Sequence, residues 1–340
     1  MSAQIWAALI AAIASLIVAI VTAVKTYRAQ QALAVLDSKL QEQRAERDAR
    51  RDYEYEAKKR LYTQCEPIIF QAMELAENFR HRVLSLARSA RTGDLLPNGS
   101  GWLASTEEYF FTSTAFFLLA PAVPLRIIQR RLTTVDLALE PRIKFQYQLL
   151  KLVFQSYTWD YDLAALAPSL DYRPDKADPG KPHRDQLLAK EPSVYRRQGL
   201  YLGIVDQLAD ALVNGNDDSY YCTPLSEFCT EIGNSQTALG RLSGDISGLI
   251  QGFHPATEPV LWRLLVTQYL LLGVFLRTGD SNIHVDSDWR KALQGESQTA
   301  AQALDWRTAD HQAASVDASP PLVMGREYLI KKLTEAELTR

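Results

Sequence analysis

This sequence has little of what usually marks an enzyme, a secreted protein or a metal-binding protein. Its 340 residues include only three cysteines, Cys65, Cys222 and Cys229, which are odd in number and irregularly spaced. That usage is typical of a reducing compartment rather than of a disulfide scaffold. The sequence contains no phosphate-binding glycine loop, dinucleotide fingerprint, HExxH motif, CxxC pair or GxSxG motif. We therefore predict no metal site and no cofactor, and the missing motifs argue against catalysis without excluding it.

The charge balance shows no large excess of either sign. The 37 basic and 40 acidic side chains give a formal net charge of −3, so no overall field favours nucleic acid as a partner. Alternating strand-like patterns and repeats of a fixed period are also missing, whereas apolar residues recur at helical spacing. We therefore expect an all-α fold.

The clearest feature that is present is an apolar run at residues 5–24. The first 24 residues contain no charged side chain. A helix of about twenty residues, at roughly 1.5 Å each, matches the roughly 30 Å hydrocarbon core of a bilayer. A cleaved signal peptide would have a basic leader and a shorter apolar stretch, and a buried core helix is the other alternative. We interpret residues 1–24 as a single transmembrane anchor, with the lipid bilayer as its partner.

The charges that flank this run predict its orientation. Lys25, Arg28 and Lys39 follow the run, whereas no basic side chain precedes it. Because cytoplasmic flanks carry the excess of Lys and Arg, we expect a single-pass protein of the cell (inner) membrane. Its N-terminus would lie outside and its body in the cytoplasm.

Residues 25–60 are predicted to form a charged helical stalk, because residues 26–60 contain no Pro or Gly and many strong helix formers. Leu33, Leu36 and Leu40 have the spacing of a coiled-coil seam, but polar residues occupy the next core positions. That is fewer heptads than a stable coiled coil needs. Two interpretations stay open, a solvated spacer or a weak self-association seam that makes the protein a homo-oligomer. Basic and acidic residues alternate along the stalk, which predicts a salt-bridged face rather than a polybasic lipid-binding patch.

The rest of the chain is predicted to form an all-α cytoplasmic bundle over residues 61–278. Residues 279–340 are predicted to be a polar C-terminal region that ends in an amphipathic helix. Five prolines fall within residues 167–193, and a structureless connection of this length is uncommon inside a compact domain. We interpret that stretch as a mobile surface loop.

Prolines also limit the helices of the bundle. The second apolar run, residues 109–125, is interrupted by Pro121 and Pro124, so we expect a buried core helix rather than a second membrane span. Pro67 lies inside a clear helical pattern, which predicts a kink or a break near that position.

Arg277 and His284 form the best catalytic candidate. Six residues separate them, a spacing that resembles the R-x4–6-H motif of HEPN-type ribonucleases, which are small all-α domains. In that family the Arg and His act on a 2′-hydroxyl and the scissile phosphate, usually across a dimer. The resemblance therefore implies a ribonuclease in which these two residues are catalytic. It covers eight residues, and an Arg at a helix C-terminus beside a loop His explains the same pattern without a function.

A second candidate site consists of Arg126, Arg130 and Arg131, which lie on one side of a predicted helix. Guanidinium groups bind phosphate through paired hydrogen bonds, so these residues are candidates for binding a phosphate-bearing ligand. The alternative is a solvated face, or ion pairs with Asp136 and Glu140.

Taken together, these patterns predict a membrane-anchored cytoplasmic helical scaffold, sensor or partner-binding protein, whose cytoplasmic protein partner no motif identifies. One alternative is the membrane-tethered HEPN-like ribonuclease described above. The other is an effector that oligomerises and perturbs the bilayer, which the Ala-rich span and the leucine seam suggest.

Overall fold

The structure is a computed structural model of the whole chain. It describes residues 3–131, 137–158, 202–216, 219–278, 289–307 and 319–338. The chain divides into two compact units, Met1–Lys59 and Arg60–Arg340. We call the first the anchor unit and the second the body, and each is described by itself. The body is built almost entirely from helices, which confirms the all-α prediction.

Helix α1 (Ala3–Thr92) supplies the anchor unit and the first helix of the body. Within the body it buries an apolar stripe that includes Leu61, Cys65 and Phe79, spaced as an amphipathic helix requires. The helix does not break at Pro67, which lies inside it. A proline in a helix costs about 3 kcal/mol, and the burial of Ile68 and other core side chains on both sides offsets this cost.

The second apolar run forms helix α2 (Tyr109–Leu119), the short 3₁₀ turn η1 (Ala120–Ala122) and helix α3 (Val123–Arg131). This run contains 18 consecutive residues that are apolar enough to span a membrane, and 83% of them are buried within the body. This confirms the prediction of a core helix. Pro121 and Pro124 lie in the first turns of η1 and α3, where the missing N–H group costs no helical hydrogen bond. A further turn, η2 (Leu137–Leu139), precedes α4 (Pro141–Ser156).

The described residues contain one small sheet, a two-stranded β-hairpin. Strands β1 (Val213–Asn216) and β2 (Ser219–Cys222) pair antiparallel after helix α8 (Leu202–Ala211), with Val213 opposite Cys222. The sequence shows no alternating pattern that predicts these strands, and we expected only helices. Glycine is needed within β1, because Gly215 has φ +105° and a Cβ there would lie 2.0 Å from the carbonyl oxygen of Ser219 on the opposite strand.

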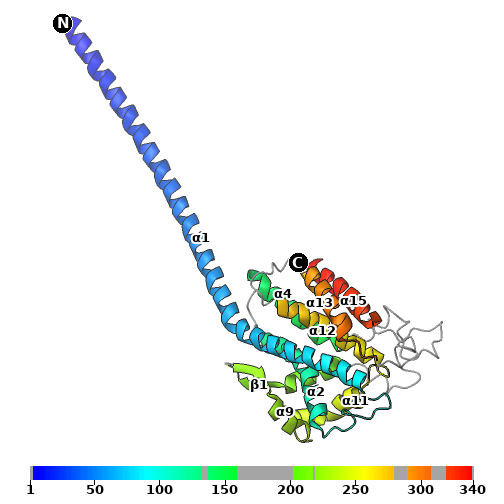
Figure 1. Cartoon of the computed structure of the whole chain (residues 1–340). Coiled ribbons are helices and arrows are strands. Elements are labelled where there is room, and N and C mark those ends of the chain that lie inside the picture. The colour runs from blue at the N-terminus through cyan, green and yellow to red at the C-terminus, as the bar shows by residue number, and fades with distance from the viewer. Residues whose placement is uncertain are drawn as a thin grey trace, which may run out of the picture. The chain divides into compact units, whose positions relative to one another are not determined.

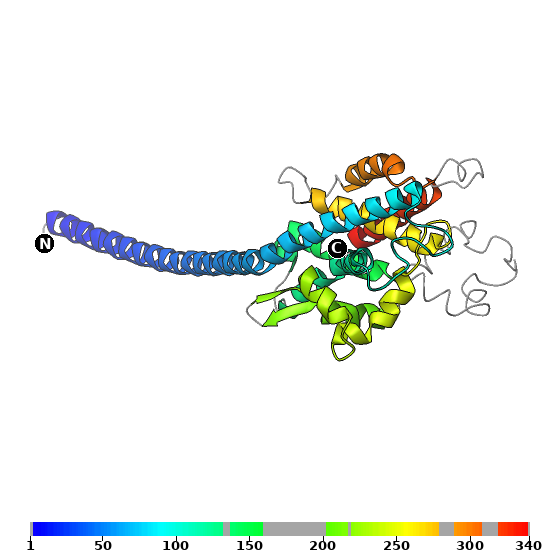
Figure 2. The ribbon, with the colours of Figure 1, turned by 60° about the horizontal axis from the view of Figure 1, so that its bottom comes forward.

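The remaining helices complete the core around α12 (Pro259–Arg277). They are α9 (Leu225–Ile232), α10 (Ala238–Arg241), α11 (Ser243–Ile250), α13 (Trp289–Ala303) and α15 (Ser319–Leu338). All side chains of α12 from Leu261 to Phe275 are buried, because this helix packs against α4, α13 and α15 (Figures 1 and 2). Helix α13 lies in the region predicted only to be polar, and the predicted 167–193 loop lies outside the described residues.

Candidate functional site

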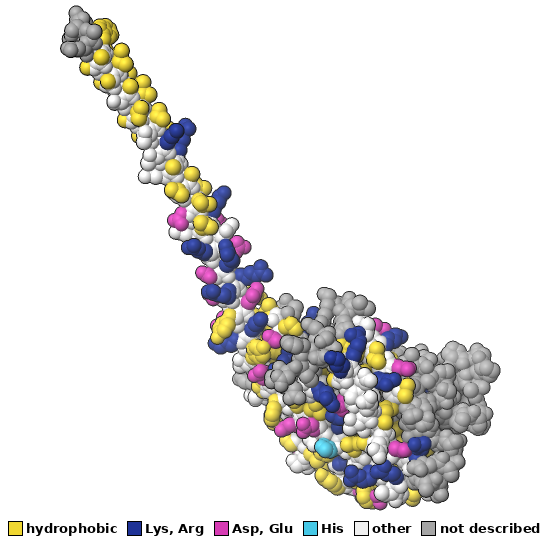
Figure 3. All heavy atoms as spheres, turned by 45° about the horizontal axis from the view of Figure 1, so that its top comes forward, with side chains coloured by type: hydrophobic (Ala, Val, Ile, Leu, Met, Phe, Trp, Pro, Cys, Tyr) yellow, Lys and Arg dark blue, Asp and Glu magenta, His cyan; other side chains and the backbone are white. Residues whose placement is uncertain are grey.

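The N-terminal part of the anchor unit presents a continuous apolar surface. The side chains of α1 are exposed from Trp6 to Tyr53, and Leu16 and Val18 expose 62% and 64% of their areas. Figure 3 shows hydrophobic side chains gathered over the N-terminal part of α1, followed by interspersed basic and acidic ones. By length and composition this helix suits a membrane span, and a signal sequence passes the same test.

The stalk carries ion pairs within its own helix. Arg50 Nε lies 3.1 Å from Glu54 Oε1, and Arg51 Nη2 lies 3.3 Å from Asp48 Oδ1. Neighbours three and four residues apart pair in this way on a solvated helix face. These pairs fit the interpretation of the stalk as a salt-bridged helix rather than a polybasic patch.

The predicted self-association residues are all uncovered in the single chain. Leu33, Leu36 and Leu40 expose 64%, 54% and 40% of their areas. Together they border a shallow apolar hollow on the surface of α1. A seam of this kind requires a second helix, which the single chain does not contain, so self-association stays a prediction.

Arg277, the first residue of the HEPN-like motif, ends helix α12 with its side chain in an ion pair. Its Nε donates a hydrogen bond to Oε1 of Glu296 at 2.8 Å. Nη2 of Arg80 donates to Oε2 of the same carboxylate at 2.5 Å. His284 lies outside the described residues, and its proximity to Arg277 stays a prediction.

Glu296 is the centre of this cluster, which joins α1, α12 and α13. Its side chain is only 6% exposed. The absence of a side chain at Gly273 leaves room for it, because a Cβ at that glycine would lie 2.7 Å from Glu296 Oε2. The guanidinium of Arg80 also stacks over the ring of Tyr269, 4.4 Å from its centroid. A buried carboxylate needs such paired and hydrogen-bonded partners, so the cluster stabilises the contact between three helices.

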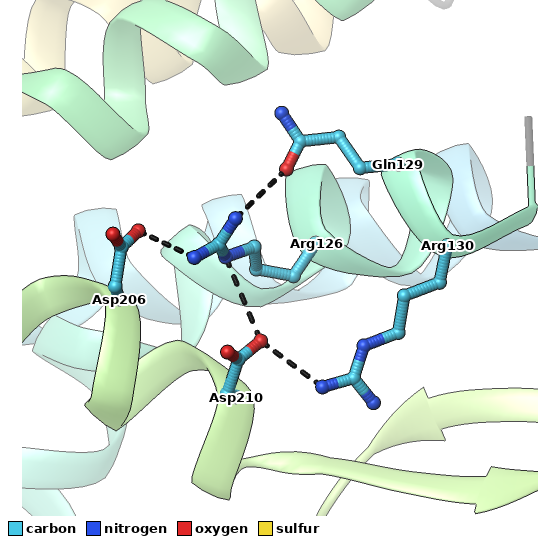
Figure 4. A network of polar contacts seen from close by, with 5 residues as sticks. All are labelled: Arg126, Gln129, Arg130, Asp206 and Asp210. Atoms are coloured by element: carbon cyan, nitrogen blue, oxygen red, sulfur yellow. Dashed lines mark hydrogen bonds and ion pairs between the residues drawn. The ribbon is translucent and has the colours of Figure 1, made fainter. Parts of the chain in front are cut away.

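The second candidate site is an ion-pair network between α3 and α8 (Figure 4). Nη2 of Arg126 donates to Asp206 Oδ1 at 2.5 Å, and Nη2 of Arg130 donates to Asp210 Oδ1 at 3.0 Å. Arg126 also donates to Oε1 of Gln129 at 3.2 Å. The sequence alternative named Asp136 and Glu140 as partners. Asp136 lies outside the described residues, and the carboxylates that contact Arg126 and Arg130 come from α8.

Aromatic rings and neighbouring groups occupy the rest of this arginine cluster. The guanidinium groups of Arg126 and Arg130 lie 5.2 and 5.7 Å from the ring centroids of Phe154 and Tyr220. Arg131 is partly buried and has a partner of its own. A phosphate would therefore have to compete with protein carboxylates for Arg126 and Arg130, and phosphate binding stays a prediction.

Two hollows of ligand size lie in the body. One of about 540 Å³ is polar and lies between the 97–104 loop and α11, with Asn98, Gln251 and Glu258 among its walls. The other, of about 510 Å³, is mainly apolar and lies between α1 and α4. Phe70 borders the second hollow and is 67% exposed.

Cys65 and Cys222 have the properties of packed thiols rather than of nucleophiles. Burial raises the pKa of the Cys65 thiol to about 11 and that of Cys222 to about 12, and a reactive cysteine needs a lowered pKa. All three cysteines are free. Among the residues that the structure describes, no three His, Cys, Asp or Glu side chains gather as a metal site would need.

Sequence reasoning missed the carboxylates that define both clusters. Glu296 is 216 residues from Arg80, and Asp206 is 80 residues from Arg126, so no local spacing connects them. One signal for Glu296 was available, because it continues the apolar stripe formed by Trp289, Leu293 and Ala300. A lone carboxylate in such a stripe predicts a buried ion pair.

Comparison with known protein families, with curated proteins and with solved structures finds no match to this chain.

Proposed function

We propose that this protein is a single-pass, membrane-anchored helical scaffold or sensor. In this proposal the anchor unit crosses the cell (inner) membrane, and the body binds a protein partner on the cytoplasmic side. The observation that carries the proposal is the apolar segment of α1. It contains 18 consecutive residues that are apolar enough to span a membrane, and 0% of them are buried. Removing apolar surface from water is worth about 25 cal/mol per Å², so this segment favours a bilayer strongly.

The charges beside the segment support the proposed orientation. Lys25, Arg28 and Lys39 follow it in the chain, and basic residues within about 15–20 residues of a span favour the cytoplasmic side. The exposed ion pairs farther along α1, such as Arg50 with Glu54, suit a stalk in water.

Candidate arginines from both sites form ion pairs with carboxylates of the protein itself, which favours a scaffold over a ribonuclease. The guanidinium of Arg277 is held by the buried carboxylate of Glu296. A scissile phosphate would have to share this guanidinium with the carboxylate, because Nε is already bonded to Glu296 and only the Nη groups would be left to bind it. Arg126 and Arg130 of α3 are also paired with carboxylates, those of the half-exposed Asp206 and Asp210.

The proposal is tested by placing charges in the span. Ile13 and Ile17 are exposed on α1, and an Arg at the centre of a membrane helix costs about 2.5–3.5 kcal/mol. We expect the double variant Ile13→Arg, Ile17→Arg to lose most of the alkali-resistant membrane fraction of the full chain. Val35→Arg, which adds the same side chain to the stalk, is the matched control and should pellet like the parent chain.

Three readouts decide the outcome. Equal alkali-resistant pelleting of the charged variant would contradict the anchor. An intact mass lacking the first residues would identify a cleaved signal sequence instead. In intact cells, a membrane-impermeant maleimide should fail to label Ser38→Cys until the cells are permeabilised, and labelling before that step would reverse the orientation.

A further inference from the structure

The membrane-like part of α1 carries a regular stripe of small side chains. They recur at alternating spacings of four and three residues, as Ala8, Ala12, Ser15, Ala19 and Thr22. All five are exposed in the single chain. Helix interfaces in lipid are enriched in small residues, because these let two backbones approach closely and gain van der Waals contact. The stripe by itself does not identify a partner.

The same alternation continues without interruption into the stalk. The next positions are Thr26, Ala29, Leu33, Leu36 and Leu40. The residues are therefore small where α1 is apolar all round, and they become leucine where charged residues surround the helix. In water the burial of leucine drives association, whereas in lipid leucine gains nothing over the acyl chains. A helix interface that passes from lipid into water requires this change of residue type at constant spacing.

The period of the seam points to another helix as the occupant. Ten consecutive positions from Ala8 to Leu40 keep the seven-residue repeat for more than four heptads. On a straight helix such a repeat drifts by about 20° per heptad, so the seam would turn away from a flat surface. Two helices that wind around each other in a left-handed supercoil keep the seam at their contact.

The hydroxyl groups of the seam are satisfied inside α1. Ser15 Oγ donates to the Ala11 carbonyl at 2.9 Å, and Thr22 Oγ1 donates to the Val18 carbonyl at 2.8 Å. Thr26 Oγ1 donates to the Thr22 carbonyl at 2.9 Å. A neighbouring helix therefore meets small side chains that need no further hydrogen-bond donor or acceptor within the bilayer.

A second stripe of small residues competes with this seam in the span. Its spacing is four throughout, as Ala7, Ala11, Ser15, Ala19 and Ala23. It would favour the right-handed crossing of GxxxG-type dimers. It ends at Tyr27, whereas the heptad seam reaches the exposed leucines of the stalk, so the observations favour the heptad seam.

We propose that two copies of this chain associate in parallel along α1, through one left-handed seam from Ala8 to Leu40. This inference rests on the proposed membrane anchor, because the anchor holds both copies at the same depth. Each seam residue then faces the same residue of the other copy. A second copy is therefore a partner whose seam has the same spacing at every position. The seam ends at Leu40, because the next core positions are taken by Gln43, Arg47 and Arg50, and the like charges of the two arginines would face their counterparts there.

Disulfide crosslinking in isolated membranes tests the seam. Ala19→Cys and Leu36→Cys place a thiol on the seam in the span and in the stalk. Ile17→Cys and Ser38→Cys place one on the opposite face of α1. We expect on the order of tenfold more linked dimer from the first pair of variants, because a disulfide needs Cβ atoms about 3.5–4.5 Å apart. The parent chain measures the background from its native cysteines.

The outcomes separate the seam from the anchor, because the alkali-resistant fraction is measured on the same samples. Equal crosslinking at all four positions of a membrane-retained protein overturns the seam and leaves the anchor intact. Stronger crosslinking at Ala11→Cys and Ala23→Cys than at Ala12→Cys and Thr22→Cys overturns it in favour of the right-handed stripe. Loss of the membrane fraction in the parent chain overturns the anchor and the inference together.

A second experiment asks whether the two parts form one interface. Ala19→Leu should lower crosslinking through Leu36→Cys several-fold, because a bulky side chain in the span separates the helices that the stalk joins. Ala14→Leu makes the same change away from the seam and should leave crosslinking unchanged. Equal effects of the two leucine variants would overturn the continuous seam.

Discussion

The anchor unit and the body use apolar side chains in opposite ways. In the anchor unit Trp6 exposes 56% of its area and Leu16 exposes 62%, whereas in the body Trp262 and Phe275 expose 1% and 0%. The body buries its apolar side chains between its own helices. The apolar side chains of the anchor unit stay exposed in the single chain, so that only a lipid phase or another molecule could cover them. Apolar content alone therefore does not separate a core helix from a membrane span.

Buried polar groups separate the two helices better. Helix α12 is buried along most of its length, yet it contains Arg263, Thr267 and Gln268. Gln268 Nε2 donates to Ser156 Oγ at 2.6 Å, so a neighbouring helix provides a partner for its amide nitrogen. The apolar segment of α1 has no charged or amide side chain from residue 5 to residue 24. Polar groups are tolerated inside a helix bundle because partners are at hand, and lipid offers none.

The largest expected effect comes from removing the same side chain in each unit. Trp262→Ala should lower the free energy of unfolding of the body by about 3–5 kcal/mol, because it leaves a cavity in the core. Trp6→Ala should leave the unfolding of the body unchanged. Both are measured by urea unfolding of the full chain in detergent micelles, followed by near-UV circular dichroism. A loss of similar size in Trp6→Ala would show that the anchor unit contributes to the stability of the body.

The sequence predicts the helices well because their apolar spacing is local information. The buried stripe of Leu61, Cys65 and Phe79 and the buried second apolar run both follow from the spacing of a few neighbouring residues. Helix α13 was missed because it is rich in Ala and Gln and has only two large apolar side chains, Trp289 and Leu293. The hairpin was missed because each of its strands has four residues, too few for alternation to be recognised.

The polar clusters of the body could not be predicted in the same way. Arg126 and Arg277 were selected from the sequence, but their partners Asp206 and Glu296 lie on helices whose packing no local pattern specifies. Opposite charges pair according to the tertiary fold, and a sequence with 37 basic and 40 acidic residues allows many such pairs. The candidate residues were therefore visible, whereas their surroundings were not.

The next expected effect compares two glutamates that pair with arginine. Glu296→Gln should destabilise the body by about 3 kcal/mol, because it removes the carboxylate that two guanidinium groups share in a buried site. Glu54→Gln removes one partner of the exposed Arg50 pair and should change stability by less than about 0.5 kcal/mol. Urea unfolding of both variants provides the measurement. Equal losses would mean that burial does not set the strength of these pairs.

A smaller effect is expected from the glycine that admits Glu296. The anchor unit contains no glycine, whereas Gly273 of the body leaves room for the buried carboxylate. In Gly273→Ala the new Cβ would lie 2.7 Å from Glu296 Oε2, so we expect a loss of about 1–3 kcal/mol. Gly248→Ala in α11 has no heavy atom within 4 Å of the new Cβ and should gain up to about 1 kcal/mol. Thermal unfolding that ranks the two variants in the reverse order would contradict the packing at Gly273.

The smallest effect concerns the acid side of the stability profile. Hydrogen bonds from Arg307 to the Asp305 carboxylate, at 2.8 Å from both Nε and Nη2, lower the pKa of Asp305. The unfolded chain therefore binds a proton at this site more readily than the folded chain. The stabilisation is complete above the unfolded pKa of about 3.9 and is lost as the pH falls through the lower folded pKa. We expect Asp305→Asn to reduce stability at pH 6 by about 0.5 kcal/mol and to flatten the acid limb of the unfolding profile. Asp48→Asn removes one partner of an exposed pair in the anchor unit and should leave the acid limb of the profile unchanged. An equal change of that limb in both variants would contradict a specific effect of Asp305 on stability.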